Sequence, residues 1–238
     1  MSEKGRRALV LGGTGYLGAA VLRGLAAAGV PSAFTYHRQA ERAAALADEL
    51  GQRAYAIDLA ERALVRALID RVCAEHGAPD AIISCAVSAH AGRLDELADE
   101  TWDRVMNVNV RGVFTVVRAL APRLREGGGD VVLTTGPDAV GAAPSAAHFA
   151  ASQTALVGLT RALASELGPH GVRVNALTVG VLAGGVGALL PPERLAEARR
   201  YSALGRLGTA EEAARAVLWL ALENPYINGA VIPVTGGI

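Results

Sequence analysis

Short apolar segments alternate with longer segments of helical periodicity along all 238 residues of the chain. The apolar segments lack the alternating polar positions of a half-exposed strand, so they are typical of a parallel sheet covered on both faces. Strands are expected at 8–11, 32–36, 54–57, 81–84, 130–134, 172–177 and 230–234. Helices are expected at 19–28, 41–50, 63–75, 102–124, 149–167, 192–201 and 210–222. We predict an α/β fold, a single-domain doubly wound Rossmann fold over residues 1–238 with about seven parallel strands and helices on both faces.

A glycine-rich loop follows the first strand and reads LGGTGYLG over residues 11–18. A helix that begins after such a loop offers unpaired N–H groups and the positive end of its dipole to a phosphate. The loop therefore predicts a binding site for the pyrophosphate of a dinucleotide. The residues expected to form it are Gly12, Thr14, Gly15, Tyr16, Leu17 and Gly18. A glycine-rich turn that holds no ligand remains the alternative.

The ends of the next strands bear on which dinucleotide would bind. The second strand ends in Tyr36-His37-Arg38, without the acidic residue that pairs with a ribose 2′-hydroxyl. Arg38 suits a 2′-phosphate, which favours NADP(H) over NAD(H), unless it is only a solvated side chain. Asp58 follows the third strand and either accepts a hydrogen bond from an adenine amino group or caps the next helix. Leu59 and Ala86 complete the expected cofactor-binding set.

The composition excludes several classes of function. Lys+Arg and Asp+Glu are both 23, so no net charge attracts nucleic acid or an anionic membrane. Lys4 is the only lysine, and Cys73 and Cys85 lie in apolar segments that suggest buried thiols; no cluster of metal ligands occurs. The charge-free segment 174–192 contains Asn175 and several glycines, which favours a strand and a loop over a membrane span. Because no secretory signal precedes the first strand, we expect a cytoplasmic protein.

Several further motifs, together with the glycine loop, resemble the short-chain dehydrogenase/reductase family, and most closely its 3-oxoacyl-acyl-carrier-protein reductase branch. They are WDRVMNVNVRGVF at 102–114, ELGPHGVRVNA at 166–176, GRLGTAEE at 205–212, YING at 226–229 and the glycines 236 and 237. The resemblance covers essentially the whole chain. It implies hydride transfer with NADP(H), an acyl-thioester or other small-molecule ligand, and a homodimer or homotetramer. It also implies a small substrate lid around 182–208.

The catalytic residues of that family are largely replaced. The resemblance places Phe149 at the position of the catalytic Tyr, Gln153 at that of the Lys, and Gly136 at that of the Ser. A shift of one residue would place Thr135 at the Ser position instead. Asn109 is the one catalytic residue retained. The resemblance also places Val87 where the family has a glycine near the cofactor, and Gly184 where it has a Thr that bonds the nicotinamide amide.

Three other side chains are candidates to replace the lost acid, namely Asp138, His148 and Tyr201. Three hypotheses about function therefore stay open. The chain is a pseudoenzyme that binds a dinucleotide or pairs with an active homologous reductase in a hetero-oligomer. Alternatively, it catalyses a non-redox step such as cyclisation, dehydration or isomerisation. As a third possibility, it is an NADPH-dependent ketoreductase with a non-standard site. Whether NADP(H) binds at all is part of the same question.

Overall fold

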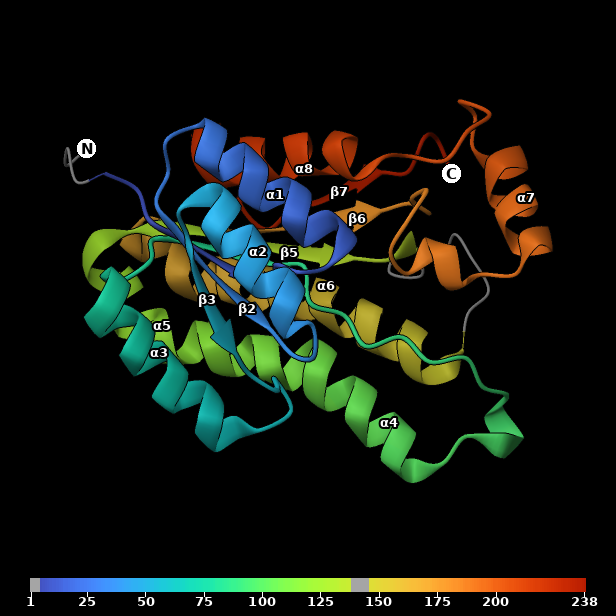
Figure 1. Ribbon diagram of the computed structural model, residues 1–238, viewed down its shortest axis with the longest axis horizontal. Helices are drawn as coiled ribbons and strands as arrows, with labels where there is room; N and C mark the ends of the chain where they lie inside the picture. The colour runs from blue at the N-terminus through green and yellow to red at the C-terminus, as the bar shows by residue number, and fades with distance from the viewer. Residues whose placement is uncertain (1–4, 138–145) are drawn as a thin grey trace.

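A computed structural model describes residues 5–137 and 146–238, and its centre is one parallel sheet (Figure 1). The strand order is β3-β2-β1-β4-β5-β6-β7, with parallel pairing throughout. The strands are β1 (Ala8–Leu11), β2 (Ser32–Tyr36), β3 (Arg53–Ala56), β4 (Ala81–Ser84), β5 (Gly129–Thr135), β6 (Val172–Val179) and β7 (Val231–Val234). The predicted doubly wound sheet of seven strands is confirmed.

Helices cover both faces of this sheet (Figure 1). One face carries α1 (Tyr16–Ala27), α2 (Ala40–Leu50) and α8 (Ala210–Leu218). The other carries α3 (Arg62–His76), α4 (Asp99–Met106), α5 (Val113–Gly127) and α6 (Ala147–Leu167). Side chains alternate along β1, so that Leu9 and Leu11 belong to the core under α3, α5 and α6, while Ala8 and Val10 belong to the core under α1 and α8. Burial on both faces explains the uninterrupted apolar strands.

Most expected element ends lie within two residues of the observed ones, but the ends of two expected helices are wrong. The segment expected as a helix at 102–124 begins three residues earlier, at Asp99, and ends three residues later, at Gly127. The first helix begins at Tyr16 and not at Ala19, because Gly15 takes an extended conformation and serves as its N-cap. The expected helix 102–124 is also divided by a π-helical turn, η2 (Asn107–Gly112), and the expected helix 210–222 ends in another, η6 (Trp219–Glu223). Hydrophobic periodicity does not reveal such turns, since they displace the pattern by only one residue.

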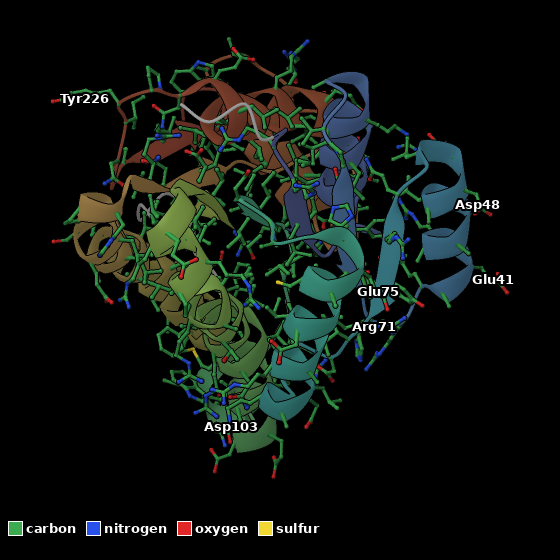
Figure 2. The ribbon with its side chains drawn as sticks, turned by 90° about the vertical axis from the view of Figure 1, so that its left-hand side faces the viewer. Glu41, Asp48, Arg71, Glu75, Asp103 and Tyr226 are labelled. Atoms are coloured by element: carbon green, nitrogen blue, oxygen red, sulfur yellow. The ribbon has the colours of Figure 1, made fainter. Side chains whose placement is uncertain are left out.

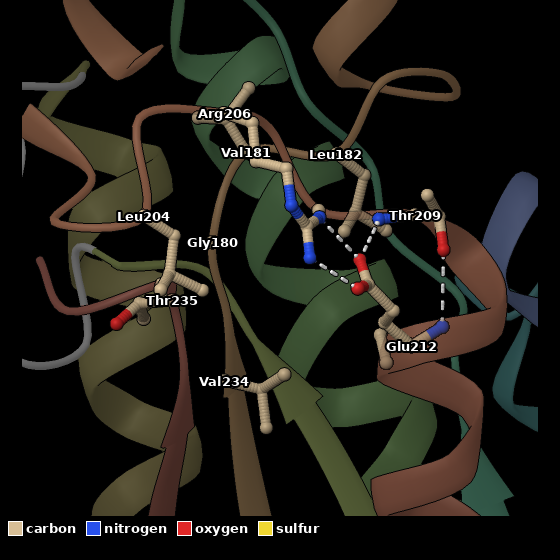
Figure 3. A pocket seen from close by; sticks show the side chains of 12 residues that line it. Gly180, Val181, Leu182, Leu204, Arg206, Thr209, Glu212, Val234 and Thr235 are labelled. Atoms are coloured by element: carbon tan, nitrogen blue, oxygen red, sulfur yellow. Dashed lines mark hydrogen bonds and ion pairs between the residues drawn. The ribbon is translucent and has the colours of Figure 1, made fainter. Parts of the chain in front are cut away.

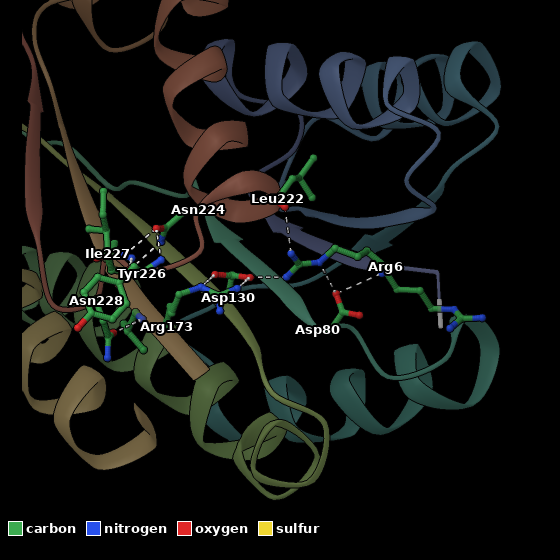
Figure 4. Close-up of polar contacts among 12 residues, drawn as sticks. Arg6, Asp80, Asp130, Arg173, Leu222, Asn224, Tyr226, Ile227 and Asn228 are labelled. Carbon is green, nitrogen blue, oxygen red and sulfur yellow. Dashed lines mark hydrogen bonds and ion pairs between the residues drawn. The ribbon is translucent and has the colours of Figure 1, made fainter. Parts of the chain in front are cut away.

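An ion-pair cluster closes the amino end of the sheet, opposite the phosphate loop (Figure 4). The carboxylate of Asp130 on β5 is 2 % exposed and accepts hydrogen bonds from Arg173 Nε at 2.8 Å and Arg173 Nη2 at 2.7 Å. Arg6 also donates to Asp130, and it reaches Asp80 at 3.4 Å. Such a buried carboxylate is tolerated because two guanidinium groups satisfy both of its oxygens.

Surface polar contacts are of a different kind. On α3, Arg71 Nε donates to Glu75 Oε1 at 2.8 Å, and the two side chains lie together on the outside of the molecule (Figure 2). Tyr226 projects from the loop before β7 and is 93 % exposed (Figure 2).

Candidate nucleotide cleft

The carboxyl end of the sheet brings the predicted phosphate loop against the chain that follows β4. Gly12 has a φ of +76°, and a Cβ on it would lie 2.7 Å from Ala86 Cα, so only glycine fits this turn. Gly12 N–H donates to Thr35 Oγ1 at 3.1 Å, and Gly13 N–H donates to Thr35 O at 2.8 Å. A Cβ on Gly18 would overlap the Gly12 carbonyl. The loop is therefore held in shape by β2 and by the close approach of α1.

The start of α1 has the features of a phosphate site. Gly15 gives no side-chain cap, and the first turn holds no acidic residue. The first N–H groups of the helix, at Tyr16, Leu17 and Gly18, therefore face the loop without a side-chain acceptor. Thr14 is buried in the turn. This arrangement can cradle an anionic group without the side chain of a lysine or arginine.

Asp58 and its neighbours lie at the ends of β2 and β3. Asp58 Oδ1 accepts from Ala60 N–H at 2.9 Å, and Oδ2 accepts from Arg104 Nη1 at 2.6 Å. His37 Nε2 is 3.4 Å from the same carboxylate. Burial favours the neutral acid, but the hydrogen bonds from Arg104 and Ala60 outweigh it and lower the pKa of Asp58. The expected helix cap is wrong in detail, because Asp58 closes the turn before α3, whose N-cap is Glu61.

Arg38 is exposed and lies two residues beyond the end of β2. A groove beside it, about 420 Å³ in volume, is open to solvent. The groove is lined by apolar side chains, among them Ile57, Leu64 and Leu68, and by the polar His37, Asp58 and Arg71. The sequence analysis did not predict that Arg104 contacts Asp58. Its place on α4, a helix that follows β4, could have suggested this contact.

A chain of neutral hydrogen bonds occupies the end of β5. Gln153 Oε1 accepts from Gly136 N–H at 2.8 Å, and Gln153 Nε2 donates to Ser152 Oγ at 3.1 Å. Ser152 Oγ also accepts from Asn109 Nδ2 at 3.0 Å and donates to the Phe149 carbonyl at 2.7 Å. Gln153 is 2 % exposed and Ser152 is fully buried. The oxygen and nitrogen of the Gln153 amide are thus both engaged.

Asn109 extends this chain to the loop after β4. Its Oδ1 accepts from Ser88 N–H at 2.7 Å, and its Nδ2 donates to Ser88 O at 3.1 Å as well as to Ser152. Asn109 lies in the π-helical turn η2, next to Gly112, whose missing side chain lets the turn pack on Leu59. The sequence did not point to Ser88 or Ser152 as members of this network, which we call the Gln153–Asn109 network.

The other residues that the sequence analysis named as catalytic positions or candidates lie in different environments. Thr135 Oγ1 is 3.1 Å from Thr178 Oγ1 within the sheet and is buried, so its hydroxyl is already paired. Phe149 is half-buried on the first turn of α6. Tyr201 ends α7 (Pro192–Tyr201) and is 64 % exposed. Asp138 lies outside the described residues.

His148 precedes Phe149 on α6 and is fully buried. Neither of its ring nitrogens has a hydrogen-bond partner among the described residues. Burial, and to a smaller extent the charge of the nearby His90, lower the pKa of His148 below 6.5, while a backbone group of His90 offsets part of this shift; the ring is therefore mostly neutral at pH 7. Such an environment is unusual, because buried polar side-chain atoms generally have a hydrogen-bond partner.

A family model described as enoyl-(acyl carrier protein) reductase matches residues 15–238. The chain belongs to the short-chain dehydrogenase/reductase family. Among curated relatives, the 3-oxoacyl-[acyl-carrier-protein] reductase of Thermotoga maritima is 30% identical over 77% of this chain and 76% of its own length. The short-chain reductase protein NovJ of Streptomyces niveus is 32% identical over 97% of this chain and 92% of its own length.

Solved structures agree with this assignment. A blue fluorescent protein from a metagenomic library, solved in complex with NADPH, has a TM-score of 0.90 and 33% identity, covering 98% of this chain and 97% of that one. A short-chain dehydrogenase of Burkholderia cenocepacia in complex with NADP has a TM-score of 0.86 and 36% identity, with the same coverage. The expected family resemblance is therefore confirmed for the whole fold.

The segment 182–208 of this short-chain dehydrogenase/reductase, expected as a lid, lies between β6 and α8. It contains the short helical turn η5 (Gly187–Leu189) and helix α7. A cavity of about 150 Å³ lies at the two ends of this segment and beside β7, and Val181, Leu182, Leu204 and Val234 line it (Figure 3). Arg206 and Glu212 close one side through hydrogen bonds of 2.8 and 2.6 Å. Arg206 is therefore held by a carboxylate and is not available as a free cation.

In 5–137 and 146–238, no three His, Cys, Asp or Glu side chains lie close enough together to hold a metal ion. Over the same ranges, no helix has both the length and the apolar character needed to cross a bilayer.

Proposed function

We propose that this short-chain dehydrogenase/reductase is a catalytically degenerate subunit that binds a nucleotide and pairs with an active homologous reductase. The observation that carries this proposal is the Gln153–Asn109 network. Its side chains are an amide, a hydroxyl and a second amide, joined to backbone groups at Gly136 and Ser88. None of these side chains ionises between pH 5 and 9.

Neutral groups of this kind do not replace a proton donor. A bound nicotinamide cofactor would supply a hydride, and the alkoxide formed on the substrate would still need a proton. General acid catalysis contributes roughly 10²- to 10⁴-fold to such a step. Here Gly136 offers no side chain, Phe149 offers no hydroxyl, and Gln153 is a neutral amide whose oxygen and nitrogen each already make a hydrogen bond. The network stabilises the end of β5 and does not relay a proton.

The cofactor in this proposal is NADP(H), held mainly by its adenosine half. The backbone amides at the start of α1 would hold the pyrophosphate, and exposed Arg38 would meet a 2′-phosphate. The groove beside Asp58, with its apolar walls, would accept part of the adenosine. The NADPH and NADP complexes of two structural relatives support this assignment.

The partner in this proposal is a second short-chain dehydrogenase/reductase subunit. Trp102 on α4 and Phe114 on α5 are 39% and 36% exposed. Large aromatic side chains that remain partly exposed on neighbouring helices are typical of an interface. The resemblance to the family implies a homodimer or homotetramer, and the same helices would accept an active homologous subunit in a hetero-oligomer.

Three measurements test this function. Calorimetric titration with NADPH should show binding, while NADPH oxidation with an acetoacetyl thioester should stay at the background rate. Native mass spectrometry after co-expression with an active homologous reductase should show mixed oligomers. A Phe114→Asp variant should reduce mixing, whereas the exposed control Tyr226→Asp should not. Steady NADPH oxidation by the chain alone, or only homo-oligomers in the mixture, would contradict the proposal.

His148 favours a second candidate function, an enzyme with a non-redox reaction in the same cleft. Its neutral, buried ring has two nitrogens with no hydrogen-bond partner in 5–137 or 146–238, and such a ring can accept a proton from a substrate. Under this alternative, a cyclisation, dehydration or isomerisation would lose at least about tenfold in rate in His148→Ala. An unchanged rate in that variant would remove the candidate.

A further inference from the structure

The side chain of Tyr16 joins the phosphate loop to the loop after β6. A Cβ placed on Gly184 would lie 2.9 Å from the Tyr16 ring atoms Cε2 and Cζ. A Cβ on Gly185 would lie 2.8 Å from Tyr16 Cβ, and Gly185 has a φ of +65°. Two consecutive glycines thus let the loop lie directly on the ring. No group can pass between the ring and this backbone.

The position of this contact follows from the strand order. Tyr16 is the first residue of α1, which begins after β1, and Gly184 follows β6. The strands β4 and β5 lie between β1 and β6 in the sheet. The contact therefore spans the carboxyl ends of β4 and β5, at the edge where Figure 1 shows the start of α1 beside the loop that follows β6.

A dinucleotide in a doubly wound sheet lies across this edge. Its pyrophosphate would rest on the start of α1, and its adenosine would extend toward Arg38 and Asp58 on the side of β2 and β3. The second nucleoside would extend the other way, over β4 and β5, toward Gly136 and Gln153. That is the side on which the Tyr16 ring meets Gly184. The residues present therefore fit the adenosine and pyrophosphate, but they do not fit the nicotinamide half.

We propose that Tyr16 is a specificity-determining residue that restricts this cleft to adenine nucleotides ending at their phosphates, and that it excludes the nicotinamide half of NADP(H). This inference rests on the proposed nucleotide-binding function and makes it narrower. The bound ligand is then an adenosine diphosphate group with a 2′-phosphate that Arg38 can meet. The nicotinamide would contribute nothing to affinity while the ring lies on the glycines.

The test compares NADPH with 2′-phospho-ADP, which keeps both phosphates of the pyrophosphate and lacks the nicotinamide nucleoside. Calorimetry on the wild-type chain should give dissociation constants within about threefold of each other. In Tyr16→Ala the ratio should shift by at least about tenfold in favour of NADPH, because the nicotinamide half gains room and new contacts. The control Tyr226→Ala removes an exposed tyrosine remote from the cleft and should leave the ratio unchanged.

Hydrogen exchange of the ligand-free chain provides a second readout. If the ring holds the loop after β6, the amides of residues 181–190 should exchange at least about tenfold faster in Tyr16→Ala than in wild type. The amides of β1 should not change, which shows that the variant is folded. Unchanged exchange in 181–190 would mean that the contact does not hold the loop, and it would overturn the inference.

The outcomes separate this inference from the proposed function. Wild-type binding of NADPH at least about tenfold tighter than 2′-phospho-ADP overturns the role of Tyr16 and leaves nucleotide binding intact. No binding of either ligand to any variant contradicts both. Equal wild-type affinities, together with a gain for NADPH in Tyr16→Ala, support both.

Discussion

The Gln153 side-chain oxygen accepts a hydrogen bond from the Gly136 amide at 2.8 Å, so a neutral side chain ties helix α6 to the end of β5. The other end of the same amide donates to Ser152 at 3.1 Å. Gln153 is therefore a structural link between two elements that both border the cleft. The family resemblance places Gln153 at the position of a lysine and Gly136 at that of a serine. In this chain the two residues are hydrogen-bonded directly to each other.

Replacement of Gln153 by Ala should destabilise the fold. The change leaves the Gly136 N–H without its acceptor and opens a cavity, and a buried unsatisfied group costs about 1–3 kcal/mol. Urea denaturation should show this loss in the free energy of unfolding. The matched control is Gln39→Ala on the exposed start of α2, which should change stability by less than about 0.5 kcal/mol. Equal stability of both variants would show that the network is dispensable.

Restoring the family's catalytic side chains should not by itself create a reductase. The triple variant Gly136→Ser, Phe149→Tyr and Gln153→Lys is expected to fold but not to oxidise NADPH with an acetoacetyl thioester, because Tyr16 still excludes the nicotinamide. Adding Tyr16→Ala should produce measurable turnover, since the acid then contributes its roughly 10²- to 10⁴-fold. Turnover by the triple variant alone would show that the nicotinamide half enters beside Tyr16.

Glu212 should make stability depend on pH under acidic conditions. Hydrogen bonds from Arg206 and from the Thr209 amide lower the pKa of Glu212 from 4.5 to about 2. A carboxylate whose pKa is lower in the folded state stabilises fully above its unfolded pKa, and this contribution fades as the pH falls from about 4.5 to about 2. Urea denaturation should therefore show wild type losing more stability than Glu212→Gln between pH 6 and pH 3.

The variant Arg206→Gln tests whether the hydrogen bond from Arg206 is what lowers the pKa of Glu212. It removes the largest contribution to the lowered pKa, so its stability should depend on pH less steeply than that of wild type over the same range. Parallel pH profiles for wild type and both variants would mean that the Arg206–Glu212 pair does not account for acid sensitivity.

Replacement of Asp130 should lower the free energy of unfolding more than replacement of most other polar residues. Removing one partner from a buried ion pair leaves the other charge uncompensated and costs about 3–5 kcal/mol. Asp130→Ala would leave Arg6 and Arg173 without this carboxylate. Thermal and urea unfolding should show that loss. In contrast, Asp95→Ala breaks an ion pair whose carboxylate side is 69 % exposed, and it should cost no more than about 1 kcal/mol.

The sequence by itself determined the parallel sheet, the phosphate loop and the absence of a tyrosine and a lysine on α6. These features are local, because a buried strand needs a continuous apolar run and a tight turn needs glycine at Gly12. Its periodicity did not reveal the π-helical turn that carries Asn109, since the turn adds only one residue to a helix.

Only the tertiary structure decided what the remaining residues do. Ser152 joins Gln153 to Asn109, which lies 43 residues earlier in the sequence. The ring of Tyr16, near the start of the chain, lies against Gly184, which follows β6. His148 is likewise an ordinary histidine in the sequence, but in the fold it is fully buried and finds no hydrogen-bond partner among the residues that the structure describes. Contacts of this kind depend on how packed helices and strands bring distant side chains together, and no local pattern of residues specifies that geometry.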